Sequence, residues 1–107
     1  MMAEQTQYRC YASTRGNPDF NQYAPISDPE GFEASSLDEL RAKLRGYMEF
    51  WGVGGGNWKD PVVHQGKKRL GRLSYNLRLW NKQGEVIDEP TNHNVIEYEL
   101  DLSRYGL

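Results

Sequence analysis

The clearest periodic pattern in the chain lies between Ser36 and Trp51. Apolar residues recur there at intervals of three and four, which is the period of one face of an α-helix. They are Leu37, Leu40, Leu44, Tyr47, Met48 and Trp51. Ser36 is followed three residues later by Glu39, which is the spacing of a capping box, and Gly52 suits a helix end. The pattern predicts one amphipathic helix over 36–51.

A second pattern, the alternation of apolar and polar residues, is typical of strands with one buried face. It occurs in 8–12, 72–80 and 95–102, and 85–88 is expected to return antiparallel to 72–80 after a turn ending at Gly84. One-sided strands favour an antiparallel sheet. We therefore expect the α+β class: a small two-layer domain with a mostly antiparallel β-sheet of about four strands and one main helix packed on one face.

The connecting segments are unusually distinct for so short a chain. At 107 residues, 1–107 is expected to form a single domain. The segment 14–35 holds three prolines and is predicted to be a long loop, a kind of segment that is usually functional or mobile. The segment 52–58 is rich in glycine, but it follows a helix and lacks the Gly-Lys-Ser/Thr ending of a phosphate loop. We interpret it as a flexible connector.

Charge is distributed unevenly, although the formal net charge is only −2. Seven cations and one acid lie between Lys59 and Lys82, whereas six acids and no cation lie between Glu85 and Asp101. Separated patches of opposite charge steer association with a charged partner. The pattern therefore favours a protein that docks onto something larger.

The basic segment is interleaved with aromatic residues, an arrangement that can follow a phosphate backbone while rings stack on bases. If 72–80 is one unbroken strand, Arg72, Arg78 and Trp80 lie on its polar face. Arginine and tryptophan contribute most at interfaces. The predicted partner-binding residues are Trp58, Lys67, Lys68, Arg69, Arg72, Arg78 and Trp80.

A plainer interpretation of the basic strand is that its arginines pair across strands with Glu97 and Glu99, which needs no ligand. The sequence leaves this alternative open. Acidic residues near the start of the helix form a secondary candidate patch, Asp28, Glu30 and Glu33, which could meet a basic groove on a partner. Acids at this position also stabilise the helix by interacting with its dipole, which needs no partner.

Reactive side chains are few. Cys10 is the one cysteine, and His64 and His93 are the two histidines, so the ligand spacing of a zinc site is missing. Asp60 and His64 resemble an acid–base pair, but no nucleophile stands near them. The chain is therefore predicted to have no catalytic residue, no bound metal and no cofactor, and not to be an enzyme. A lone cysteine and the lack of an apolar leader favour a cytoplasmic location.

In its size, its 12% of aromatic residues and its lack of a catalytic motif, the chain is similar to small α+β proteins encoded by phages and mobile elements. Some of these inhibit bacterial defence systems such as CRISPR effectors. The resemblance implies a non-enzymatic binding protein that occupies a surface or nucleic-acid channel of a larger protein or ribonucleoprotein complex. A nucleic-acid-binding module and a small enzyme or small-molecule binder remain alternatives. No membrane partner is expected, and monomer and homodimer both stay open.

Overall fold

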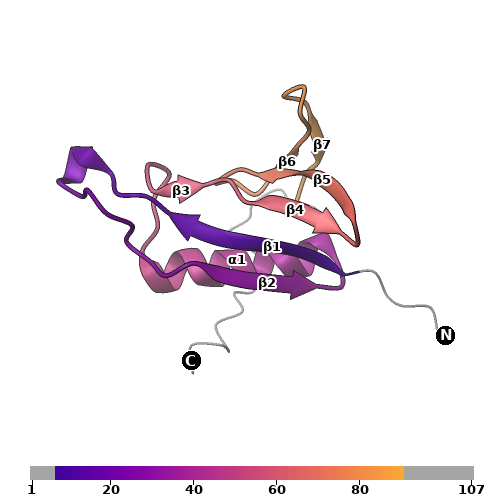
Figure 1. Cartoon of the computed structure of the whole chain (residues 1–107), viewed down its shortest axis with the longest axis horizontal. Coiled ribbons are helices and arrows are strands. Elements are labelled where there is room, and N and C mark those ends of the chain that lie inside the picture. The colour runs from indigo at the N-terminus through magenta and orange to yellow at the C-terminus, as the bar shows by residue number, and fades with distance from the viewer. Residues whose placement is uncertain (1–6, 91–107) are drawn as a thin grey trace.

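The computed structural model describes residues 7–90, which form an antiparallel sheet of seven strands with one α-helix against it (Figure 1). The strands are β1 (Tyr8–Thr14), β2 (Glu30–Ala34), β3 (Trp58–Lys59), β4 (Val62–Gln65), β5 (Lys68–Leu73), β6 (Leu79–Trp80) and β7 (Val86–Asp88). The helix α1 (Leu37–Trp51) lies between β2 and β3 in sequence, and a short 3₁₀ helix, η1 (Pro18–Phe20), follows β1. The strand order is β2-β1-β4-β5-β6-β7, with β3 paired to β1. The expected α+β class is confirmed, but the predicted number of strands was too low.

The helix begins and ends where its local sequence predicts. The Ser36 hydroxyl accepts a hydrogen bond from the Glu39 amide at 3.0 Å. The Glu39 carboxylate reaches back to the amide and hydroxyl of Ser35, each at 2.8 Å, so the reciprocal half of the capping box is displaced by one residue. Gly52 adopts a left-handed conformation with φ of +66° and ends the helix.

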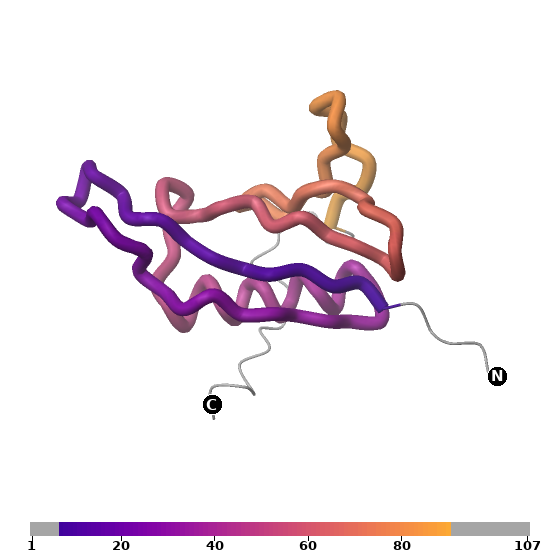
Figure 2. Tube along the Cα trace, viewed as in Figure 1, coloured from indigo at the N-terminus to yellow at the C-terminus, as the bar shows by residue number. Residues whose placement is uncertain are grey.

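One face of the sheet is covered by the helix. The buried core residues are Cys10, Ala12, Phe32, Ala34, Leu40, Leu44, Tyr47, Met48, Val53, Trp58, Val63, Leu73, Leu77 and Leu79. The predicted apolar stripe supplies four of these from α1, and Leu37 and Trp51 pack against its edge. Figure 2 shows the helix running behind β1 and β2. The opposite face of these strands is therefore not covered by α1.

The predicted loop over 14–35 is shorter in the structure. Thr14 completes β1, and Glu30–Ala34 pairs antiparallel with β1 from Ala12↔Glu30 to Tyr8↔Ala34. The sequence did not predict β2, because only two of its five residues, Phe32 and Ala34, are buried and the apolar pattern is therefore short. The remaining residues 15–29 form a projecting arm, which lies at the opposite end of the sheet from the first residues of β1 (Figure 2).

The arm is held by polar contacts with the Gly-rich segment. The Gln22 side-chain oxygen accepts hydrogen bonds from the Asn17 amide at 3.1 Å and from the Asn57 side-chain nitrogen at 2.9 Å. Asn57 also donates to the Arg15 carbonyl at 3.0 Å. The segment after Gly52 therefore connects α1 to β3 and also supports the base of the arm.

The predicted strand over 72–80 was wrong. The chain leaves β5 at Leu73, turns through residues 74–78 and returns as β6, so that Arg72 pairs with Trp80. Leu77 takes a positive φ of 65°, and its amide donates to the Ser74 carbonyl at 2.7 Å. Leu73, Leu77 and Leu79 are buried as one long strand would have them, but Tyr75 in the turn is 39% exposed. The predicted return strand is confirmed as β7, whereas the predicted strand 95–102 lies outside the described residues.

The buried thiol of Cys10 and the buried hydroxyl of Tyr47 both have raised pKa values, so we expect the protein to be less stable at alkaline pH. Burial raises the pKa of the Cys10 thiol from 9.0 to about 12, and burial is also the main cause of a raised pKa at Tyr47. The folded state keeps both protons where the unfolded chain releases them. Their contribution to stability is therefore complete below about pH 9 and is lost as the pH rises toward about 12.

We expect the free energy of unfolding in urea to fall between about pH 8 and about pH 10.5. The fall should be smaller in Cys10→Ala, because the variant has no thiol to titrate, although its stability at the lower pH is reduced by the cavity that it creates. An identical fall in both proteins would show that the thiol titrates alike in the folded and unfolded states.

Candidate binding surface on the open sheet face

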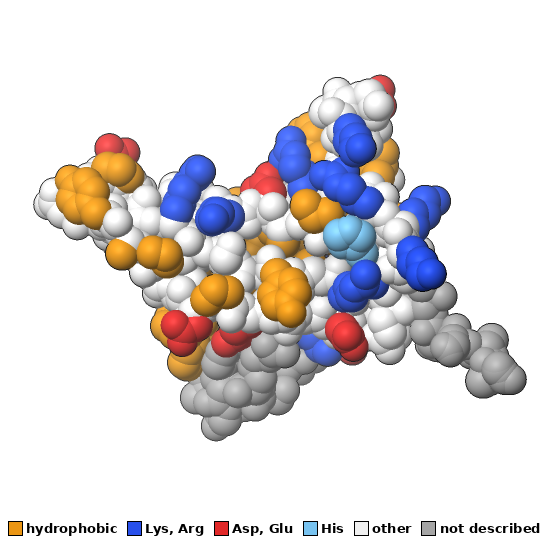
Figure 3. All heavy atoms as spheres, in the orientation of Figure 1, with side chains coloured by type: hydrophobic (Ala, Val, Ile, Leu, Met, Phe, Trp, Pro, Cys, Tyr) orange, Lys and Arg blue, Asp and Glu red, His pale blue; other side chains and the backbone are white. Residues whose placement is uncertain are grey.

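The face of the sheet that α1 leaves open carries cations and rings from several strands. Side chains alternate along a strand, so Arg9 and Tyr11 point away from the buried Cys10 and Ala12. We call this surface the open face, and its members are Arg9, Tyr11, Val62, His64, Arg69, Arg72 and Trp80. Figure 3 looks onto it and shows Lys and Arg side chains gathered over β4, β5 and the end of β1.

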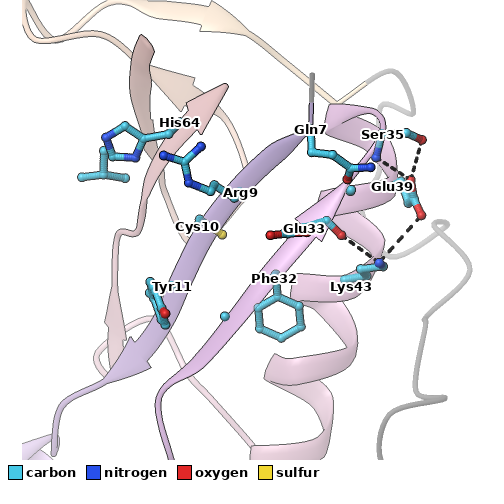
Figure 4. A pocket seen from close by; sticks show the side chains of 13 residues that line it. Gln7, Arg9, Cys10, Tyr11, Phe32, Glu33, Ser35, Glu39, Lys43 and His64 are labelled. Carbon is cyan, nitrogen blue, oxygen red and sulfur yellow. Dashed lines mark hydrogen bonds and ion pairs between the residues drawn. The ribbon is translucent and has the colours of Figure 1, made fainter. Parts of the chain in front are cut away.

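Strand register places several of these residues in one row. Arg9 pairs with His64 of β4, and His64 pairs with Arg69 of β5. On its other side Arg9 pairs with Glu33 of β2. Directly paired residues point to the same face of a sheet. Figure 4 shows Arg9 and His64 side by side at the edge of an open hollow, with Tyr11 further along the same strand.

Arg9 and Arg69 of the open face, and Lys67 and Lys68 beside it, are bound to no carboxylate within residues 7–90. The Arg9 guanidinium donates to the Gly66 carbonyl at 2.6 Å, which positions the side chain without neutralising its charge. Arg69 is exposed on β5, and Lys67 and Lys68 are exposed at the turn between β4 and β5. None of these four forms an ion pair with a described residue. Within residues 7–90, therefore, no carboxylate neutralises their charge.

Arg72 is positioned by two neighbours. It forms an ion pair with Asp60, and its guanidinium lies 5.6 Å from the centre of the Trp80 ring, within the range of a cation–π contact. The indole nitrogen of Trp80 donates to the Ser74 hydroxyl at 3.0 Å. Arg72 and the half-buried Trp80 thus form a fixed pair at one end of the open face.

Tyr11 is the most exposed ring on this surface, at 75%. Its partner across the strands is Gly31, and a Cβ at that position would stand 3.2 to 3.7 Å from three atoms of the tyrosine ring. The ring therefore lies over the glycine backbone. Because one side rests on β2, the other side is presented to solvent as a flat apolar surface.

Four of the predicted partner-binding residues are not members of the open face, and two of them, Lys67 and Lys68, lie at the β4–β5 turn beside it. Trp58 is only 3% exposed and its indole donates to the Leu73 carbonyl at 3.1 Å, so the prediction that it anchors a partner was wrong. Arg78 lies in the turn before β6, where its guanidinium is 3.5 Å from Glu89. The predicted pairing with Glu97 and Glu99 concerns residues outside the described part.

The predicted acidic patch is divided between two faces. Glu33 is exposed on the open face beside Arg9, whereas Glu30 lies on the side of the strand that bears the buried Phe32 and Ala34. Asp28 lies at the base of the arm, where its carbonyl accepts a hydrogen bond from the Tyr47 hydroxyl at 2.8 Å. The three residues therefore do not form one patch.

The groups that suggested chemistry have structural partners. Of the residues that resemble an acid–base pair, Asp60 binds Arg72 through its carboxylate, and His64 lies beside Arg9. Cys10 is buried with a raised pKa, so at neutral pH the thiolate that would react is suppressed. Across residues 7–90 no group of three or more His, Cys, Asp or Glu side chains is arranged to hold a metal ion. Nor is any helix there long and apolar enough to span a membrane.

Comparison with protein-family models, curated proteins and solved structures finds no match to this chain. Its function must therefore be argued from the geometry. Sequence reasoning identified the basic strand but missed Arg9, Tyr11 and the position of His64. The alternation in β1 already placed Arg9 and Tyr11 on one face, but the register that joins them to β4 and β5 is a long-range feature.

Proposed function

We propose that the protein is a non-enzymatic binding protein that docks its open face onto an anionic surface of a larger macromolecular complex. The proposal rests on one observation: cationic side chains and an exposed tyrosine ring lie on the same face of the sheet. Tyr11, whose ring is 75% exposed, lies two residues from Arg9 on β1, and the pairings of Arg9 with His64 and of His64 with Arg69 continue from Arg9 toward the lysines of the β4–β5 turn.

Charge of this kind acts chiefly on the rate and orientation of association. The cations would steer the protein to its partner, and the exposed ring would lose its contact with water on docking. Such occupation excludes any other ligand of the same surface. Inhibition of a bacterial defence complex by a phage or mobile-element protein is the form of this proposal that the size of the chain and its scarcity of reactive groups support.

The proposal can be tested with a photocrosslinking residue placed either on the open face of the sheet or on the helix α1. Tyr11 is replaced with p-benzoylphenylalanine in one protein, and Phe50 of α1, which is 46% exposed, is replaced in a matched control. After irradiation in a lysate of the cells that make the protein, we expect a discrete adduct of higher mass from position 11 and none from position 50.

The same experiment includes a charge control. Combining Arg9→Ala and Arg69→Ala in the position-11 protein should reduce the adduct, because both cations are expected to contact the partner. Equal crosslinking from the two layers, or an adduct that survives loss of both arginines, would mean that the open face is not the docking surface.

A further inference from the structure

Tyr11 has the geometry of a base-stacking platform. Its ring lies over Gly31, where a side chain would push it up, and the β1–β2 pairing holds the backbone on both sides. Stacking needs a flat ring with one open side, and every nucleic-acid base offers a matching surface. Tyr23, in contrast, is 80% exposed on the arm, away from the row of cations.

The row of Arg9, His64 and Arg69 lies beside this platform. Adjacent strands are about 4.8 Å apart, so the backbones of Arg9 and Arg69 lie about 10 Å apart with His64 between them. Lys67 and Lys68 continue the positive charge at the β4–β5 turn. A phosphate chain that crosses the strands would meet these donors in succession.

A second ring stands at the other end of the open face. Arg72 lies over the Trp80 ring, and the Val62↔Arg72 pairing brings this pair to the face that bears His64. A guanidinium held against a ring offers its own plane to a base. Tyr11 lies two residues after Arg9 and Val62 two residues before His64 on antiparallel strands, so Tyr11 and the Arg72–Trp80 pair flank the row of cations on the same side.

We infer that the open face binds single-stranded nucleic acid, with a base stacked on Tyr11 and the backbone following Arg9, His64 and Arg69. This inference rests on the proposed function and names the anionic surface that it requires. An acidic protein surface would also satisfy the cations, but bases offer the open side of the Tyr11 ring a flat stacking partner that carboxylates do not. A duplex keeps its bases stacked on one another and so leaves the ring without a partner.

Fluorescence anisotropy with labelled oligonucleotides tests the inference. The probes are oligothymidine and oligouridine of about 15 nucleotides, within the usual site size for such surfaces. A duplex of the same length and heparin, an anionic polymer without bases, are the comparison ligands. We expect both single strands to bind more tightly than the duplex or heparin at equal salt.

Substitutions then separate stacking from charge. Tyr11→Ala should weaken binding of the single strands about 10-fold or more, Tyr11→Trp should retain it, and neither should change heparin binding. Tyr23→Ala, which removes an equally exposed tyrosine, should have no effect. Arg9→Ala should reduce the slope of log K against log salt for oligothymidine by about 0.7. Thermal unfolding of each variant checks that it is folded.

Several results of these binding experiments would overturn the inference. No binding of either single strand, or binding that Tyr11→Ala leaves unchanged in a folded protein, overturns the inference. So does tighter binding to heparin than to both oligonucleotides. If the position-11 crosslink then forms with a protein and persists after nuclease treatment, the proposed docking function stands and only its nucleic-acid form is wrong.

Discussion

Replacing Arg41 with Met is expected to lower the free energy of unfolding by about 1–3 kcal/mol. Arg41 is only 1% exposed, and it contacts three separate parts of the chain. Its Nε donates to the Leu77 carbonyl at 2.8 Å, one terminal nitrogen donates to Asp38 at 3.1 Å, and the other donates to Asp88 at 2.7 Å. The guanidinium therefore ties α1 to the turn before β6 and to β7.

The loss has two physical sources. Met fills much of the buried volume, but it leaves the Leu77 carbonyl without its donor, and an unsatisfied buried acceptor costs about 1–3 kcal/mol. Leu77 also has a positive φ of 65°, a conformation that persists for a bulky residue only when its surroundings hold it. Without Arg41, the turn loses one of the contacts that hold it.

Urea denaturation at neutral pH measures this change. Arg41→Lys should restore only a small part of the lost stability, because one ammonium group cannot reach three acceptors in fixed directions. Lys43→Met is the matched control on the same helix. Lys43 pairs with Glu39 at 3.8 Å near the surface, so its loss should change stability by less than about 1 kcal/mol. A loss of similar size in both variants would contradict the role assigned to Arg41.

Gly71→Ala is expected to destabilise the protein by about 2–3 kcal/mol and to disrupt the end of the open face. A Cβ at Gly71 would overlap the Trp80 carbonyl oxygen and approach the Leu79 side chain at 3.3 Å. The carbonyl belongs to the backbone of β6, so it can move only if the β5–β6 pairing opens. The need for glycine here is steric, since Gly71 is not among the residues with positive φ.

Opening that pairing would also displace Trp80 from Arg72, because the two are direct cross-strand partners. We therefore expect Gly71→Ala to lose stability in urea and also to bind single-stranded oligonucleotides more weakly. Gly55→Ala is the control, since a Cβ there would meet only Tyr75 at an ordinary distance of 3.7 Å. If the Gly71→Ala variant were as stable as the Gly55→Ala variant, the close approach of β5 and β6 would not be required for the fold.

The helix and the first strand could be predicted from the sequence because their signals are local. Ser36, Glu39 and Gly52 act within one turn of the helix ends, and the apolar stripe needs only the helical period. The same locality explains the failure at 72–80. The alternation does not show where the chain turns, and the turn makes contacts with residues far away in sequence, such as the hydrogen bond from Arg41 to the Leu77 carbonyl, 36 residues apart.

The open face also has some features that the sequence predicts and others that depend on the tertiary structure. Composition and alternation determined that the chain carries basic and aromatic residues on one-sided strands, with a helix to cover the other side. The tertiary structure alone decided that Arg9, His64 and Arg69 stand in one row, that Tyr11 lies over Gly31, and that Trp58 is buried. Strand register and burial depend on contacts between segments far apart in sequence, and a residue's own neighbours in the chain do not specify them.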